Sequence, residues 1–361
     1  MKVMVICGTR PEWIKMASTI RALQKHKDIE LVVVNTGQHK ELSEQIIKLF
    51  KLPVNYNLKI MKKNQSLCDI VKNAIGNLGK IIENEKPYLV LVHGDTTTSL
   101  TGALATFYNK TLLMHIEAGA RSFNKNLPFP EEANRQLIAR IADYHICTCE
   151  GHRKNLEKEN IKSIISGDPD MDALMMLPHI TPCKKEQILI TMHRRENWGA
   201  PIYDVCTAIL ELANLYSNYK FIISCHPNPK VKNIVKSVIE DNPIQQKNIE
   251  VHTAMPYDKF IKTMVESKLI ITDSGGIPQE AATFKIPVLI TRDFFENKEM
   301  LNLNLAKVVG TKCDNVVSNV IKLLDNNKEY EKMREAKSPY GDGNAYKIII
   351  KEIEKILRGE Q

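Results

Sequence analysis

Acidic residues recur directly after short apolar runs in the first half of the chain. Asp95 follows the run 88–92, Glu117 follows the run 112–116, and Glu131 opens a stretch of helical length. If these runs are parallel strands, their carboxyl ends meet at one edge of a sheet and the carboxylates lie close together. Close carboxylates repel each other and lose hydration, so at least one should hold a proton near neutral pH. This pattern indicates acid–base catalysis, although Glu131 could equally be an acid favoured at a helix start.

Two other segments suit the binding of phosphate. Arg10 and Lys15 place two cations near a helix start expected within the segment Gly8–Glu12. Ser274-Gly275-Gly276 precedes another helical stretch, in which Glu280 could reach a ribose hydroxyl pair. Helix starts with exposed amides or nearby cations bind anions such as a diphosphate. Both segments also fit ordinary strand–helix turns, and neither is a G-x-G-x-x-G or P-loop motif.

Positive charge in the second half is concentrated after one apolar run. His193, Arg194 and Arg195 follow the run 187–191, whereas His226 after the next run is more typical of a structural histidine. The rest of the net charge of +8 is spread along the chain rather than gathered in one stripe, which argues against a nucleic-acid partner. A nucleotide diphosphate would account for local cations, and solubility alone is the simpler alternative.

The elements that must position these residues are short apolar runs alternating with amphipathic stretches. This rhythm occurs in two consecutive sets of about six units, which predicts an α/β protein with two Rossmann-like, doubly wound domains. We expect an N-terminal domain at 1–168, a C-terminal domain at 169–340, and a helix within 341–361 that packs back on the first domain.

Composition excludes several other classes. No apolar run reaches the ~18 residues that a membrane span needs, and the first apolar run ends at Gly8 without a small-residue cleavage site. The eight cysteines are scattered, and Cys147 and Cys149 lack a second pair at metal spacing, so we expect buried thiols and no metal. These features predict a cytoplasmic protein with no membrane partner.

Taken together, the motifs resemble those of the non-hydrolysing UDP-N-acetylglucosamine 2-epimerases, and the resemblance runs nearly end to end. Each motif alone is weak, and their order and spacing make the match specific. The motifs are GTRPE from Gly8, TGQHKE from Thr36, HGDT from His93, EAG-x-R from Glu117, PEEANR from Pro130, HRREN from His193, HPNP from His226, DSGG-x-x-x-EA from Asp273 and PYGDG from Pro339.

The resemblance implies the two-domain fold of B-type glycosyltransferases, with the active site in the cleft between the domains and UDP bound mainly by the second. It implies elimination of UDP across C1–C2 to a 2-acetamidoglucal and re-addition with the proton delivered to the other face. It also implies a homodimer and no cofactor or metal. The implied roles are acid–base catalysis for Asp95, Glu117 and Glu131, support of the leaving phosphate for His193, substrate or UDP binding for Arg10, Lys15, Arg135, Ser274, Gly275, Gly276, Glu280 and Arg292, and an activator site for a second UDP-N-acetylglucosamine at Gln38, His39 and Lys40.

Several departures from the family pattern leave the hexosamine open. The usual R-D-x-T-E-R-P-E is Arg292–Glu299 here, with Phe295 for Thr, Asn297 for Arg and Lys298 for Pro. Ala120 stands for Leu, one acid is missing before Glu280, and Gly167-Asp168-Pro169 stands where the family commonly has G-N-T. The alternatives are therefore a 2-epimerase of a modified UDP-N-acetyl sugar, a UDP-sugar-dependent glycosyltransferase, or a UDP-sugar sensor without activity.

Overall fold

The chain divides into two compact units, which we describe separately. Unit 1 comprises Met1–Leu177 and Pro339–Gln361, and unit 2 comprises Pro178–Ser338. The computed structural model describes residues 1–39, 41–62, 65–177, 185–194, 197–226, 228–242, 247–253, 255–295, 297–341 and 343–360. No helix within these described ranges is both long and apolar enough to cross a membrane.

Unit 1 is a seven-stranded parallel sheet in the order β3-β2-β1-β4-β5-β6-β7. Its strands are β1 (Lys2–Cys7), β2 (Glu30–Asn35), β3 (Tyr56–Asn57), β4 (Leu89–His93), β5 (Leu112–Ala118), β6 (Tyr144–Cys147) and β7 (Ile164–Ile165). The strands β1 and β4 are buried almost throughout because helices cover both faces of the sheet, which is why their sequences are apolar runs without alternation.

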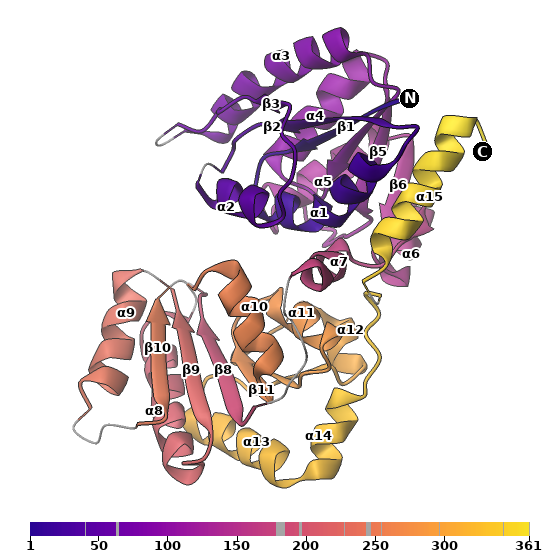
Figure 1. The fold of residues 1–361 in the computed structure, drawn as a ribbon. Coiled ribbons are helices and arrows are strands. Elements are labelled where there is room, and N and C mark those ends of the chain that lie inside the picture. The colour runs from indigo at the N-terminus through magenta and orange to yellow at the C-terminus, as the bar shows by residue number, and fades with distance from the viewer. Residues whose placement is uncertain are drawn as a thin grey trace. The chain divides into compact units, whose positions relative to one another are not determined.

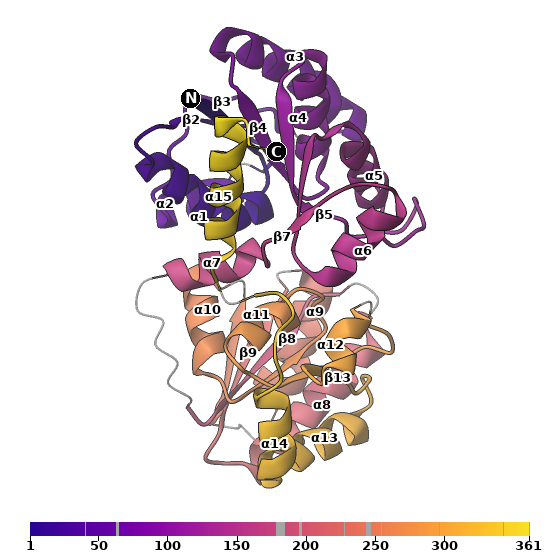
Figure 2. The ribbon, with the colours of Figure 1, turned by 90° about the vertical axis from the view of Figure 1, so that its right-hand side faces the viewer.

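The helices of unit 1 form two layers (Figure 1). They are α1 (Arg10–Lys25), α2 (Glu41–Leu49), α3 (Leu67–Glu85), α4 (Thr97–Tyr108), α5 (Glu131–Ile141), α6 (Glu150–Lys158), α7 (Pro169–Met176) and α15 (Ala345–Arg358). The helices α3, α4 and α5 pack side by side, and α1 packs against α2, α7 and α15. The chain therefore returns to unit 1 at its C-terminal end, where α15 lies along α1 (Figure 2).

Unit 2 is a six-stranded parallel sheet in the order β10-β9-β8-β11-β12-β13. The strands are β8 (Gln187–Met192), β9 (Lys220–Cys225), β10 (Ile249–Thr253), β11 (Leu269–Thr272), β12 (Val288–Ile290) and β13 (Ala306–Val308). The helices are α8 (Ala200–Leu215), α9 (Pro229–Val235), which continues into the π-helix Lys236–Glu240, α10 (Tyr257–Glu266), α11 (Ile277–Thr283), α12 (Lys298–Asn302), α13 (Cys313–Asp325) and α14 (Asn327–Arg334).

These sheets confirm the predicted fold class and most predicted strands. The runs expected at 88–92, 112–116 and 187–191 form β4, β5 and β8, and the short strand β3 was not predicted. The expected domain boundary after residue 168 must move, because α7 packs on α1 and the division follows Leu177. In each sheet the strand order reverses once. The reversal lies between β1 and β4 in unit 1 and between β8 and β11 in unit 2. Ligands of doubly wound sheets bind at such points.

A buried carboxylate anchors the C-terminal helix in unit 1. Asp172 of α7 is 2% exposed and accepts hydrogen bonds from the amides of Ala345 and Tyr346, at 2.9 and 2.6 Å. The Ser18 hydroxyl of α1 donates to the same carboxylate at 3.3 Å. Asp172 thus satisfies the first amides of α15, which lack a capping side chain from Asn344. One side chain therefore joins α7, α1 and α15.

Asp172 is expected to make unit 1 less stable as the pH rises through about 6. Burial raises the pKa of this carboxyl from 3.8 to about 6, although the bonds from Tyr346, Ala345 and Ser18 lower it. The native state then binds the proton more tightly than the unfolded chain, so the free energy of unfolding falls between about pH 4 and 6, by at most about 3 kcal/mol. Asp172→Asn should remove this component.

Tryptophan fluorescence offers the measurement, because the chain has two tryptophans and Trp13 is the one in unit 1. Urea unfolding in a Trp198→Phe background at pH 4.5 and 7 should show a flatter pH dependence for Asp172→Asn than for its parent. Asp28→Asn, at an exposed turn, is the control. Equal pH dependence in all three proteins would contradict the prediction.

Candidate functional site

The loops that follow β1 and β4 in unit 1 are joined by Glu12. This side chain is 1% exposed, and its Oε2 accepts the amides of Gly8 and Thr9 at 2.9 and 2.6 Å. Its Oε1 accepts the hydroxyls of Thr96 and Ser99, at 2.7 and 2.8 Å. Glu12 therefore fixes the two loops at the point where the sheet reverses. The sequence signal was the acid at the third position of the helix after Thr9, a capping-box pattern.

Glu117 occupies an irregular position at the end of β5. The pairing of β5 with β6 shifts register between Ile116 and Ala118, and Glu117 has a φ of 62°. A positive φ is uncommon for a residue with a side chain and is a recognised form of stored strain at functional sites. In a regular strand the Glu117 side chain would point to the face set by the alternation of the strand, and the bulge changes that direction. The backbone thus places this carboxylate specifically.

Lys15 and His93 contact the same oxygen of Glu117. Nζ of Lys15 donates to Oε2 of Glu117 at 2.7 Å. Nε2 of His93 lies 2.9 Å from that oxygen, without the alignment of a hydrogen bond. Burial favours the protonated acid, but Lys15 and His93 outweigh it and hold the pKa of Glu117 well below its usual range. Glu117 is therefore ionised at neutral pH.

Lys15 also lies near two acids at the start of α7. Its Nζ is 3.4 Å from Asp170 Oδ2 and 4.0 Å from Asp168 Oδ1. Burial alone lowers the pKa of Lys15, but the carboxylates of Asp168, Asp170 and Glu117 raise it well above its ordinary value. The sequence predicted Lys15 beside a phosphate, whereas the structure surrounds its ammonium with carboxylates from the same unit.

Asp95 has a different environment from Glu117. Its Oδ2 accepts a hydrogen bond from Arg135 Nη2 at 2.5 Å. Burial raises the pKa of Asp95, Arg135 lowers it, and the charges of Glu117 and Glu131 raise it further. The net direction is upward. The structure thus brings the three predicted acids together, and Asp95, rather than Glu117, is the one whose protonated form is favoured.

Two neighbouring buried residues, Glu132 and His115, support this arrangement rather than take part in it. Glu132 is fully buried, accepts the amides of Ser122 and Phe123 at 2.9 and 3.3 Å, and so holds the loop after β5. His115 is buried too, and its Nε2 contacts the carbonyl of Gly94 at 2.7 Å. That contact fixes the turn that carries Asp95, where Gly94 has a φ of 67°.

Unit 2 contains a corresponding carboxylate where its own sheet reverses. Asp273, which follows β11 and is 1% exposed, accepts the amides of His193 and Arg194 at 2.9 and 3.0 Å. It also accepts Nδ2 of Asn197 at 3.2 Å, and that amide donates to the Thr291 carbonyl at 3.0 Å. The loops after β8, β11 and β12 are therefore joined, just as Glu12 joins those after β1 and β4.

His193 stands in this joined region with its ring edge against His226. Their ring centroids are 6.2 Å apart, and the His226 ring is 6.1 Å from that of Trp198. Burial lowers the pKa of His193, although the charge of Asp273 raises it. The net effect favours a neutral imidazole. His226 accepts the amide of Asn228 at 3.1 Å, which fits the structural role predicted for it.

The glycine-rich segment after β11 differs in part from the prediction. The amide of Ser274, expected to face a phosphate, donates to Thr272 Oγ1 at 2.9 Å. A Cβ on Gly275 would lie 2.9 Å from Nη2 of Arg194, so a glycine lets this guanidinium lie across the segment. Gly276 precedes α11, which carries Glu280, and Arg292 is 7% exposed just beyond β12. Arg194 was not singled out from the sequence as a ligand.

The residues expected at an activator site lie beside Glu12 and α4. Gln38 Oε1 accepts the amide and the hydroxyl of Thr98, at 3.1 and 2.8 Å. His39 Nδ1 accepts the Arg10 amide at 3.2 Å, and burial lowers the pKa of His39. Lys40 lies outside the described residues. Both described side chains thus help to fix the loop after β2.

Two of the three departures at 292–299, Phe295 and Asn297, have structural explanations. Phe295 is 2% exposed and forms part of the core of unit 2. Asn297 caps α12, because its Oδ1 accepts the Met300 amide at 3.3 Å. Phe295 and Asn297 therefore have local structural roles in unit 2. Among the described residues no group of three or more His, Cys, Asp or Glu side chains could hold a metal ion.

Comparison with known proteins agrees with this architecture. MurG of Acinetobacter baumannii is only 13% identical but has a TM-score of 0.60 over 98% of this chain and 99% of its own, a likeness of fold alone. The crystal structure of UDP-GlcNAc 2-epimerase from Neisseria meningitidis bound to UDP-GlcNAc has a TM-score of 0.85, covering 98% and 100% of the two chains. The fold is thus that of the B-type glycosyltransferases, with two Rossmann-like domains.

Sequence comparison identifies the family. The model of the UDP-N-acetylglucosamine 2-epimerase family matches residues 21–354. The enzyme of that name from Neisseria meningitidis is 40% identical over 374 residues, covering 98% of this chain and 100% of its relative. The enzyme from Methanocaldococcus jannaschii, solved in complex with UDP-GlcNAc and UDP, is 29% identical with a TM-score of 0.75 and covers 98% of this chain and 99% of its own. The chain belongs to the UDP-N-acetylglucosamine 2-epimerase family and is an epimerase.

Proposed function

We propose that this protein interconverts UDP-N-acetylglucosamine and UDP-N-acetylmannosamine without net hydrolysis. C2 of the sugar has no neighbouring carbonyl to acidify its hydrogen, so simple removal and return of the proton would be slow. In the proposed reaction a base takes the C2 proton while the C1–O bond to UDP breaks, giving a C1=C2 double bond. UDP then attacks C1, and an acid delivers a proton to the opposite face of C2.

The observation that carries this proposal is the contrast between Glu117 and Asp95. Glu117 is ionised, is placed by a bulge, and is contacted by Lys15 and His93 through Oε2. Oε1 is then the oxygen that takes the proton from C2. Asp95, whose pKa is raised, is the group suited to hold the proton for the other face. Two acids whose environments separate their pKa values are the usual arrangement for paired acid and base roles.

Unit 2 supplies the second requirement, which is stabilisation of a departing UDP. The proposal assigns His193, Arg194 and Arg292 to the diphosphate and Glu280 to the ribose. The loop carrying His193 and Arg194 is held by Asp273, so these groups need not reorganise as charge develops on the leaving oxygen. Arg135, in contrast, is assigned to Asp95 rather than to UDP, because the two form an ion pair.

Proton NMR in heavy water tests the proposal directly. UDP-N-acetylglucosamine incubated with the protein should yield UDP-N-acetylmannosamine, with solvent deuterium at C2 of the product. Formation of the epimer with its C2 proton retained would sink the elimination mechanism. Stable transfer of the sugar to an acceptor, or tight binding without turnover, would instead favour a glycosyltransferase or a sensor.

A further inference from the structure

The acids at the start of α7 lie against Lys15, which in turn contacts Glu117. Asp168 and Asp170 follow Gly167, and their carboxylates lie 4.0 and 3.4 Å from Lys15 Nζ, which is 2.7 Å from Glu117. The side chains of Lys15, Asp168 and Asp170 are only 16%, 4% and 18% exposed. Water therefore screens these charges poorly, and each affects the others strongly.

We propose that Asp168 and Asp170 are positioning residues for the epimerase reaction, which share the Lys15 ammonium with Glu117 and so limit how strongly Lys15 holds that carboxylate. The inference rests on the proposed role of Glu117 as the base. A base paired with an unshared buried ammonium would be a weak proton acceptor, since the cation favours its ionised form. Two further carboxylates divide that attraction and repel Glu117, which leaves Glu117 a stronger proton acceptor than it would be beside an unshared ammonium.

The charge balance around Lys15 supports this role. One ammonium faces three carboxylates, so the group is net negative and offers little attraction to a diphosphate. Asp168 is also fixed independently of Lys15, because its Oδ1 caps α7 through the Asp170 amide at 3.0 Å and its own amide donates to the Tyr340 carbonyl at 2.6 Å. Asn is as good an N-cap as Asp, so the negative charge at 168 is not a requirement of the cap.

The charged and titratable groups that face Glu117 come from several elements. Burial lowers the pKa of His152 and the Glu117 charge raises it, so α6 also contributes a group. The Glu117 charge raises the pKa of Asp95 as well. The groups are Lys15, His93, Asp95, His152, Asp168 and Asp170, with Arg135 and Glu131 acting on Asp95. The variants must therefore change charge without changing shape.

The test compares Asp168→Asn, Asp170→Asn and the double variant with wild type, and uses Asp28→Asn, an exposed acid at the turn after α1, as the control. Asn keeps the cap at 168. The acid limb of kcat/KM should move to lower pH, by a few tenths of a unit for each single variant and about one unit for the double. The kcat plateau should fall severalfold as Glu117 becomes a weaker base, and the control should match wild type.

A second readout does not depend on turnover. Carboxyl-labelled glutamate followed by carbon NMR, with the signal assigned by Glu117→Gln, should show Glu117 titrating at lower pH in the double variant. An unmoved Glu117 titration, or a loss of kcat that is equal at every pH, would overturn the inference. Failure of wild type to exchange deuterium at C2 would overturn the proposed function instead, and the NMR titration would still decide whether Asp168 and Asp170 act on Glu117.

Discussion

Glu117→Gln is expected to lower kcat for epimerisation by at least about 100-fold, the usual scale for a positioned acid–base group. The amide keeps the size of the side chain and its place in the bulge, but it cannot accept the C2 proton. Substrate binding should change less, because Lys15 and His93 contact Glu117 from within unit 1 and are not proposed to bind the sugar. The measurement is the initial rate of epimer formation with saturating UDP-N-acetylglucosamine.

Matched variants separate chemistry from folding. Glu83→Gln, at an exposed position of α3, is the control and should retain the wild-type rate. Asp95→Asn and His193→Ala should also lose about 100-fold. In Asp95→Asn, moreover, one of the two epimers should gain deuterium at C2 faster than it inverts, since only the return of the proton to the other face is blocked. A loss under about tenfold in all three variants would refute the proposed site.

Much of the site in unit 1 was predictable because it depends on topology. Asp95 and Glu117 each follow a buried apolar run, and parallel strands bring such positions to one edge of the sheet. Glu131 is the first residue of α5, and its charge raises the pKa of Asp95. What the sequence could not give was the electrostatic state of each acid. That state depends on contacts such as Lys15–Glu117, 102 residues apart, which no local pattern encodes.

The carboxylates that hold the loops were harder to recognise than those proposed to act on substrate. Glu12 is part of a family motif, and its burial beneath four donors emerges only when β1 and β4 lie side by side. Similarly, Asp168 caps α7 and alternates with Asp170 and Asp172 inside it, and in the sequence only Asp168 stands out, as a departure from the family pattern. The acids contact different neighbours, which are Lys15 for the first two and α15 for the third.

Asp273→Asn is expected to weaken the binding of UDP by about 10- to 100-fold and to lower the free energy of unfolding by about 2–3 kcal/mol. Asp273 Oδ2 accepts from both the Arg194 amide and Asn197 Nδ2. An asparagine with its amide nitrogen at the Oδ2 position would place a donor against these two donors. In the other orientation the amide nitrogen takes the Oδ1 position and faces the His193 amide, which lies 2.9 Å from Oδ1. Either orientation leaves a buried donor without a partner.

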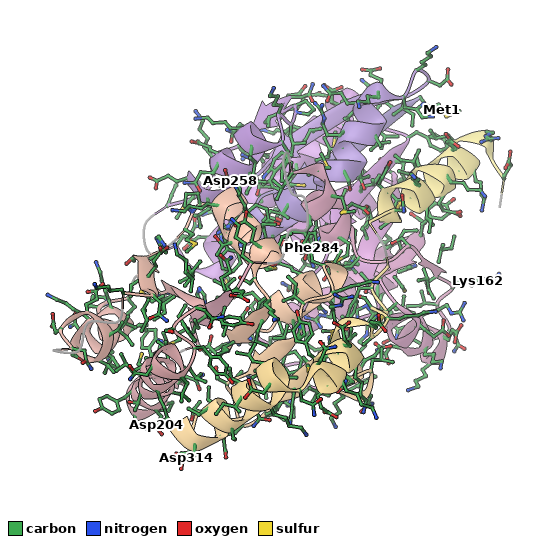
Figure 3. All side chains as sticks on the ribbon, turned by 60° about the horizontal axis from the view of Figure 1, so that its bottom comes forward. Met1, Lys162, Asp204, Asp258, Phe284 and Asp314 are labelled. Carbon is green, nitrogen blue, oxygen red and sulfur yellow. The ribbon has the colours of Figure 1, made fainter. Side chains whose placement is uncertain are left out.

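The loss should extend beyond the substituted residue, because Asp273 organises the groups that we assign to the diphosphate. Its partner Asn197 is also held by the Thr291 carbonyl, next to Arg292, so the loops after β8 and β12 should loosen together. Calorimetric titration with UDP measures the affinity, and thermal unfolding measures the stability. Asp314→Asn, at an exposed position near the start of α13 (Figure 3), is the control and should match wild type in both. Wild-type affinity in Asp273→Asn despite a lowered stability would mean that Asp273 supports the fold of unit 2 but does not position its UDP-binding loop.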